Sequence, residues 1–188
     1  MASSHITRFK WLAAFSSLLF ATAGSAQTLR FDSVWWRQTI HDAERTGFVL
    51  GYFDCPAAPK EVSGTTSEDY VAYVYKHLGS SSTSSNVPSV LLQANLHLHP
   101  RPILKGGEEY PEKHGWLDGA WWGDATHGDS DEQAGYVEGY LACEFGHATT
   151  SQTRRIVDEL NHHFGLEKNE HDKIADVLQP ILDRKKRN

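Results

Sequence analysis

Histidine and carboxylate side chains are the first residues of this chain that could perform chemistry. The chain holds 11 histidines, and His97 and His99 lie a short distance before His114, with several glutamates between them. Zinc is bound by imidazole and carboxylate groups that converge on one point. None of the spacings follows a specific motif such as His-Glu-x-x-His. We therefore expect no bound metal and no other cofactor, and we keep these three histidines as candidate ligands.

The sequence contains none of the specific catalytic or nucleotide-binding motifs considered next. The sequence has no Gly-x-Ser-x-Gly elbow, no phosphate-binding loop and no dinucleotide fingerprint. Glu108 and Glu109 are adjacent, but adjacent carboxylates in a loop do not identify a general acid and a general base. The sequence therefore indicates no particular type of reaction and no catalytic residue.

The chain contains two cysteines, Cys55 and Cys143. Each ends a run in which glycine, glycine and cysteine are four residues apart, and residues four apart share one face of a helix. In an oxidising compartment we expect the two cysteines to form a disulfide with each other. Two separate buried thiols are the alternative.

The glycines of these two runs need an explanation, because each glycine inside a helix costs about 1 kcal/mol relative to alanine. Close packing of two helices would compensate that cost, and room for a ligand is the alternative. The glycines concerned are Gly47, Gly51, Gly135 and Gly139.

The sequence also repeats itself. Residues 31–55 and 117–143 share an Asp-x-x-Trp-Trp segment and a Gly-aromatic-Val-x-Gly-Tyr-x-x-Cys segment. We predict a duplication, with one repeat at residues 27–98, an irregular linker at 99–116 and a second repeat at 117–188. The aromatic pairs recur in both copies, which favours core anchors over ligand stacking; they are Trp35, Trp36, Trp121 and Trp122.

Each repeat is predicted to contain three helices. The first would span about residues 32–54 in the first copy, a second would begin at a Thr-x-x-Glu or Thr-x-x-Gln capping box, and a third would begin near Pro88. Pro180 should kink or end the last helix. The expected fold is all-α, with two pseudo-symmetric three-helix repeats packed as one domain.

Two positions break the apolar pattern of the repeat. Glu138 stands where the first copy has Leu50, and Asp54 stands where the second copy has Ala142. Such breaks can mark a site. We favour the simpler interpretation that these carboxylates face solvent.

Composition and the first residues indicate where the protein works. The chain has 188 residues, 39% of them hydrophobic, and a net charge of -6. This is a globular composition, and the acidic balance argues against nucleic acid as a partner. Residues 1–26 have the pattern of a signal peptide, with an N-terminal membrane anchor as the alternative. We expect a periplasmic or secreted protein with no stable membrane span after cleavage.

The first copy resembles the Tai-type immunity proteins. The resemblance rests on Gly47-Phe48-Val49-x-Gly51-Tyr52, then Asp54-Cys55-Pro56, then Thr66 and the apolar helices that follow it. Proteins of that family are small, exported and helical, and they block peptidoglycan amidase effectors of type VI secretion. The present chain differs in being a tandem duplication and in lacking a cysteine after its last helix.

Together these observations predict an exported helical binding protein. Its partner would be a protein or cell-envelope material, and the resemblance implies an immunity-like inhibitor of an envelope-targeting enzyme. The alternative is an envelope hydrolase with its site in the linker between the repeats.

Overall fold

The computed structural model describes residues 28–39, 41–62, 64–78, 86–99, 117–123 and 130–186. The predicted signal peptide and nearly all of the predicted linker lie outside these ranges. The elements, in order, are β1 (Thr28–Leu29), α1 (Ser33–Gln38), α2 (Asp42–Asp54), α3 (Ser67–Leu78), α4 (Val87–His97), α5 (Gly119–Gly123), α6 (Ser130–Phe145), β2 (Ala148–Thr149), α7 (Thr150–Phe164), the 3-10 helix η1 (Glu167–Asn169) and α8 (Ile174–Lys186). The prediction of an all-α fold is confirmed.

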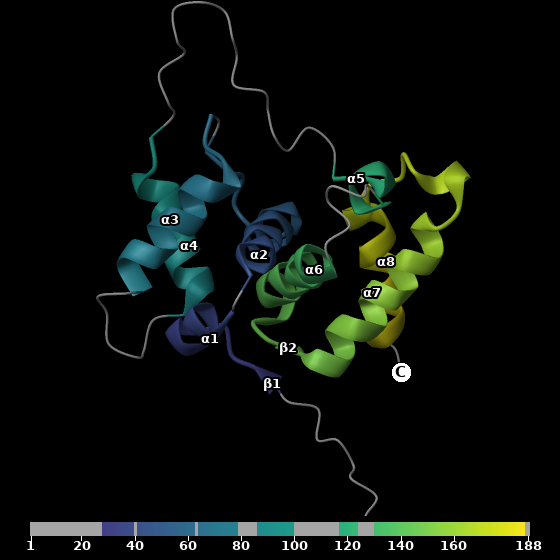
Figure 1. Ribbon diagram of the computed structural model, residues 1–188, viewed down its shortest axis with the longest axis horizontal. Helices are drawn as coiled ribbons and strands as arrows, with labels where there is room; N and C mark the ends of the chain where they lie inside the picture. Colours follow the sequence, from purple (N-terminus) through teal and green to yellow (C-terminus); the bar gives the residue numbers. More distant parts are fainter. Residues whose placement is uncertain are drawn as a thin grey trace, which may run out of the picture.

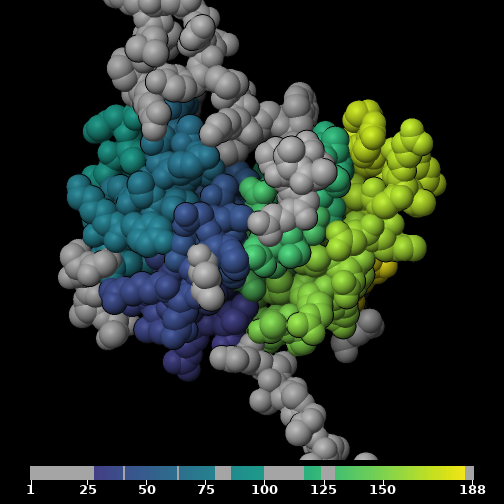
Figure 2. All heavy atoms as spheres, viewed as in Figure 1, coloured from purple at the N-terminus to yellow at the C-terminus, as the bar shows by residue number. Residues whose placement is uncertain are grey.

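Helices α2 and α6 lie side by side at the centre of the molecule (Figure 1). Helices α1, α3 and α4 lie on one side of this pair, and α5, α7 and α8 lie on the other. We call residues 28–99 the first half and residues 117–186 the second half. The space-filling view shows the two halves in contact along a broad front (Figure 2), and one hydrophobic core runs through both.

The predicted long helix at residues 32–54 is wrong, because the chain breaks between α1 and α2. Thr39 is extended, with ψ at 109°, and ends α1. The Arg45 guanidinium of α2 donates hydrogen bonds to the carbonyl oxygens of Trp36, at 3.1 and 3.0 Å, and Thr39. A buried cation thus satisfies the carbonyl groups that a helix end leaves unpaired.

The second half repeats this break with a different side chain. The Gln133 amide of α6 donates to the Trp122 carbonyl oxygen at 2.7 Å, at the end of α5. The described part of each half therefore contains four α-helices rather than the three predicted.

Other contacts also recur in both halves. The amide of Val87 donates to the Phe31 carbonyl oxygen at 2.7 Å, and the amide of Ile174 donates to that of Leu117 at 2.9 Å. In each case the start of the last long helix is joined to the residue two positions before the first residue of the Trp-Trp helix. These pairs are consistent with a duplication, which stays a prediction.

Two helix-end predictions need correction. The first-half capping box uses Thr66 and Asp69 rather than Thr65 and Glu68: the Thr66 amide donates to Asp69 Oδ2 at 3.0 Å, and the Asp69 amide donates to Thr66 Oγ1 at 3.4 Å. Pro180 does not end α8, which continues to Lys186. Proline removes one backbone donor, and packing of the rest of the helix against the core offsets that loss.

Strands β1 and β2 form a minimal antiparallel sheet. Thr28 pairs with Thr149, and Leu29 pairs with Ala148. The start of the first half is thereby hydrogen-bonded to the segment that leads from α6 into α7.

Candidate functional site

The central α2–α6 pair is the scaffold that positions every candidate site. Gly47 of α2 lies against the backbone of Glu132 and Tyr136 of α6, and the following contacts advance along both helices in the same direction. The two helices are therefore parallel. A methyl group at Gly51 would overlap the Tyr136 carbonyl oxygen, and one at Gly139 would overlap that of Phe48. Backbone occupies the space beside these glycines, which leaves none for a ligand.

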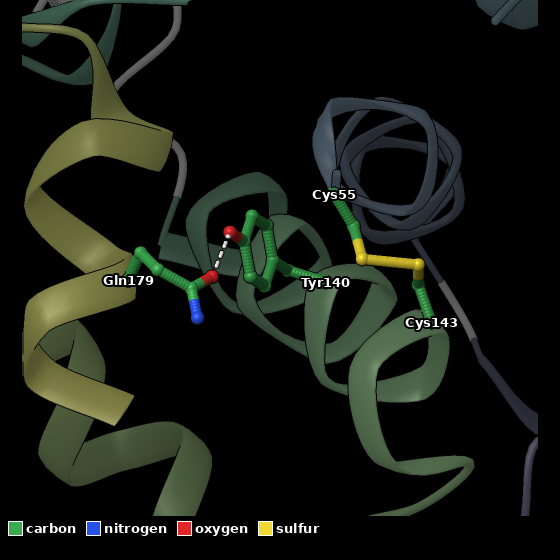
Figure 3. Close-up of a disulfide and its surroundings, with 4 residues drawn as sticks. All are labelled: Cys55, Tyr140, Cys143 and Gln179. Carbon is green, nitrogen blue, oxygen red and sulfur yellow. Dashed lines mark hydrogen bonds between the residues drawn. A yellow bond between two sulfur atoms is a disulfide. The ribbon is translucent and has the colours of Figure 1, made fainter. Parts of the chain in front are cut away.

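A disulfide joins the two central helices at their C-terminal ends. Cys55 and Cys143 are bonded, with 6.4 Å between their Cα atoms (Figure 3). Beside it, the Tyr140 hydroxyl points toward α8 and donates to Gln179 Oε1 at 2.7 Å. Together these links connect α2, α6 and α8.

The four tryptophans predicted as core anchors are core residues. Trp36 and Trp122 are buried, and Trp35 and Trp121 are partly buried against the same core. The indole N–H of Trp122 donates to Asn161 Oδ1 at 2.7 Å. Trp36 and Trp122 are too deeply buried to stack on a ligand, whereas Trp35 also lines a small surface pocket with His41 and Glu44.

A hollow lies between α7 and α8 on the outer side of the second half. It is an open groove of about 850 Å³. Its apolar part is formed by Leu166, Val177, Pro180 and Ile181. Leu166 is 48% exposed, although large apolar side chains are usually covered.

Charged and polar side chains form the rim of this α7–α8 groove. Arg184 of α8 contacts Glu159 of α7 at 3.4 Å. His163 Nε2 lies 2.9 Å from Asp172 Oδ2, and its backbone carbonyl accepts from Asn169 at 2.7 Å. The rim carries both signs of charge around an apolar floor.

A second, smaller pocket of about 210 Å³ contains two carboxyl groups, Asp54 and Glu61. Lys60, Phe53 and Leu117 also line it. Leu117 follows the predicted linker, so the pocket lies where that linker re-enters the described structure. The sequence placed Asp54 on a solvent-facing surface, but the structure turns it into this pocket.

The environments of the two carboxyl groups differ. Burial raises the pKa of Asp54, while a hydrogen bond from the Tyr136 hydroxyl opposes that rise. Burial, followed by the charge of Asp54, raises the pKa of Glu61 to about 7. Titratable groups with perturbed pKa values in a concave site are candidate acids and bases.

Glu138 is also not solvent-facing, which corrects the favoured interpretation of its sequence position. It is 6% exposed, and its Oε2 has no hydrogen-bond partner among the described residues. Helix α6 is covered by α2 on one side and α7 on the other, so an outward face is missing at this position. Burial raises the pKa of Glu138 to about 8, with a further rise from the charge of Glu44.

The candidate metal ligands are not brought together by the described part of the chain. His97 lies beside the ring of Tyr73, with 6.4 Å between centroids, and His99 follows the end of α4. His114 lies outside the described residues, as do Glu108 and Glu109. Within the described ranges no three His, Cys, Asp or Glu side chains are grouped as a metal site would require.

Among the described helices, none combines the length and the apolar character that a membrane-spanning helix needs.

Comparison with known proteins adds no relative. No family model, curated protein or solved structure matches the chain.

Proposed function

We propose that this chain is an exported binding protein and that the α7–α8 groove receives a segment of a protein partner. The groove carries the proposal, because it combines an apolar floor with a polar rim of both charges. Protein interfaces have this anatomy, with a hydrophobic centre surrounded by polar side chains. A groove between two helices also suits an amphipathic helix of the partner.

The Tai-type resemblance supplies the class of partner within this proposal, an enzyme that attacks the cell envelope. Gly47 and Gly51, which carry much of the resemblance, contact α6 rather than solvent. The shared motif thus belongs to the scaffold, and the partner surface should be sought on the outer helices. An immunity-like inhibitor would present the groove to its target enzyme.

The first test places a photo-crosslinking amino acid at Leu166 in the groove, in cells that export the protein. We expect one crosslinked partner from this position and none from Leu96, which is an exposed leucine on α4 in the other half. The substitution Leu166→Asp should weaken binding of that partner at least tenfold, because a charge would be desolvated in an apolar site. Leu96→Asp is the matched control.

Equal crosslinking from both positions, or full binding by the Leu166→Asp variant, would contradict the groove as the binding surface. Purified peptidoglycan amidase assayed with and without the protein then tests the immunity-like role.

A second candidate function, envelope hydrolysis, is favoured by the pocket that contains Asp54 and Glu61. Two carboxyl groups in different environments can divide the roles of general acid and general base. Glu61, with a pKa of about 7, would supply the proton, and Asp54, hydrogen-bonded by Tyr136, would act as the base. The site would lie beside the linker rather than in it.

Hydrolysis of purified peptidoglycan across pH 4–9 tests this alternative. We expect activity that declines above pH 7 as Glu61 loses its proton, and a loss of about 100-fold or more in Glu61→Gln or Asp54→Asn. Glu167→Gln, at an exposed position of η1, should retain full activity. Absence of product release at every pH, or activity that survives both pocket substitutions, would remove the hydrolase from consideration.

A further inference from the structure

The contact between α6 and α7 contains an unusual pair of polar groups. Glu138 of α6 and Thr153 of α7 are 6% and 3% exposed. Thr153 lies close enough to lower the pKa of Glu138, but neither Glu138 Oε2 nor Thr153 Oγ1 makes a hydrogen bond of normal geometry with a described residue. Unpaired polar atoms in a protein interior cost about 1–3 kcal/mol each. Both atoms therefore lower the stability of this interface.

The first half shows that this position does not require a carboxyl group. Leu50 occupies the corresponding place on α2 and is 5% exposed. An apolar side chain is therefore compatible with a central helix at this point. The carboxyl group at Glu138 needs a reason other than packing.

The groups around Glu138 make its ionised form unfavourable. From α2 it faces Glu44, a carboxyl group whose charge opposes a second negative charge. From α7 it faces the neutral hydroxyl of Thr153, which favours the ionised form but is a weaker influence than burial. Strand β2, which also packs on α6, is Ala148–Thr149 and carries no charge.

The surroundings of Glu44 complete this set of charges. Burial, followed by the charge of Asp131, raises the pKa of Glu44, whereas His41 and Arg45 lower it. The Arg45 guanidinium is already bonded to the Trp36 and Thr39 carbonyl oxygens and to Asp42, at 2.8 Å. No cation pairs with Glu138 among the described residues.

We propose that the Glu138 carboxyl group is a proton-dependent latch, which holds α7 against α6 only while it is protonated. When the proton leaves, no described cation neutralises the charge, the Thr153 hydroxyl offsets its burial only in part, and opening of α7 lets water reach it. Helix α7 also forms one wall of the α7–α8 groove. The protonation state of Glu138 would therefore determine how well ordered that wall is. The latch itself does not depend on what the groove binds.

The direction of the pH effect follows from linkage. The folded state holds the proton up to a pKa of about 8, whereas the unfolded or opened state releases it near 4.5. Opening is therefore favoured progressively as pH rises from about 4.5 to 8 and changes little above that. Between pH 6 and pH 9 the opening equilibrium of α7 should increase about 100-fold.

Hydrogen exchange of the α7 amides, corrected for intrinsic rates, measures this equilibrium without any partner. We expect the protection factors of α7 to fall about 100-fold from pH 6 to pH 9 in the natural chain, and to stay constant in Glu138→Gln and in Glu138→Leu. The leucine variant restores the residue type of the first half, so it serves if the glutamine variant folds poorly. Glu167→Gln is the control and should behave as the natural chain does.

Two results would overturn the latch. One is an α7 whose protection does not change with pH in the natural chain. The other is an equal loss of protection in α3, or in the Glu138 variants, because the pH effect would then arise elsewhere in the molecule.

Discussion

Gly139→Ala is expected to lower the free energy of unfolding by at least about 3 kcal/mol, because the new methyl group would overlap the Phe48 carbonyl oxygen. The obstruction is backbone, so no rotamer change can relieve it, and α2 and α6 must separate. This loss exceeds the gain of about 1 kcal/mol that alanine brings to a helix. Urea unfolding followed by circular dichroism at 222 nm would measure the effect.

Gly123→Ala is the matched control for this substitution. Gly123 ends α5, and a methyl group there would meet no atom within 4 Å. Its free energy of unfolding should change by no more than an ordinary surface substitution causes, about 0.5 kcal/mol. A Gly139→Ala chain with an unchanged midpoint would show that the helices are not packed as closely as described.

Reduction of the disulfide is expected to have a comparable effect. The bond closes a loop with a sequence separation of 88 residues, for which the loss of chain entropy corresponds to about 4–5 kcal/mol. For a chain of this size that change would lower Tm by roughly 8–20 °C. Thermal unfolding with and without reductant would measure it.

Assignment of this effect is simple, because the chain has no other cysteine. A variant with both cysteines replaced by alanine should melt at the lower temperature with and without reductant. A natural chain whose Tm does not respond to complete reduction would contradict a stabilising role for the bond.

Local patterns were sufficient to predict that the fold is helical and which residues join the two central helices. The four-residue spacing of Gly47, Gly51 and Cys55 placed small residues and a thiol on one helical face, and that face is where α6 packs. Such a spacing is a property of the sequence itself. It needs no knowledge of the remaining fold.

The break between α1 and α2 could not be found in the same way. Residues 32–54 contain no proline, and their two glycines, Gly47 and Gly51, lie well after Thr39, so no helix-breaking residue marks an end at Thr39. The break is stabilised by Arg45, which folds back onto the last carbonyl groups of α1. A helix end capped from the following helix leaves no composition signal at the break.

The positions of Glu138 and Asp54 were misjudged for a related reason. A charged residue is normally assigned to the outer face of an amphipathic helix, but α6 is buried on most of its circumference. A central helix has no outer face, so the usual rule fails there. The approach of Glu61 to Asp54 depends on the path of the chain after α2, which periodicity does not describe.

The pairing of β1 with β2 has a consequence for the order in which the chain is made. Thr28 finds its partner in Thr149, and the glycine face of α2 finds its partner in α6. A nascent first half therefore lacks both its sheet partner and the cover for its central helix until most of the second half has been synthesised. Folding of this kind depends on contacts distant in sequence, which slows it relative to folding through local contacts alone. The central contact of the molecule can therefore be completed only after the second half has been synthesised.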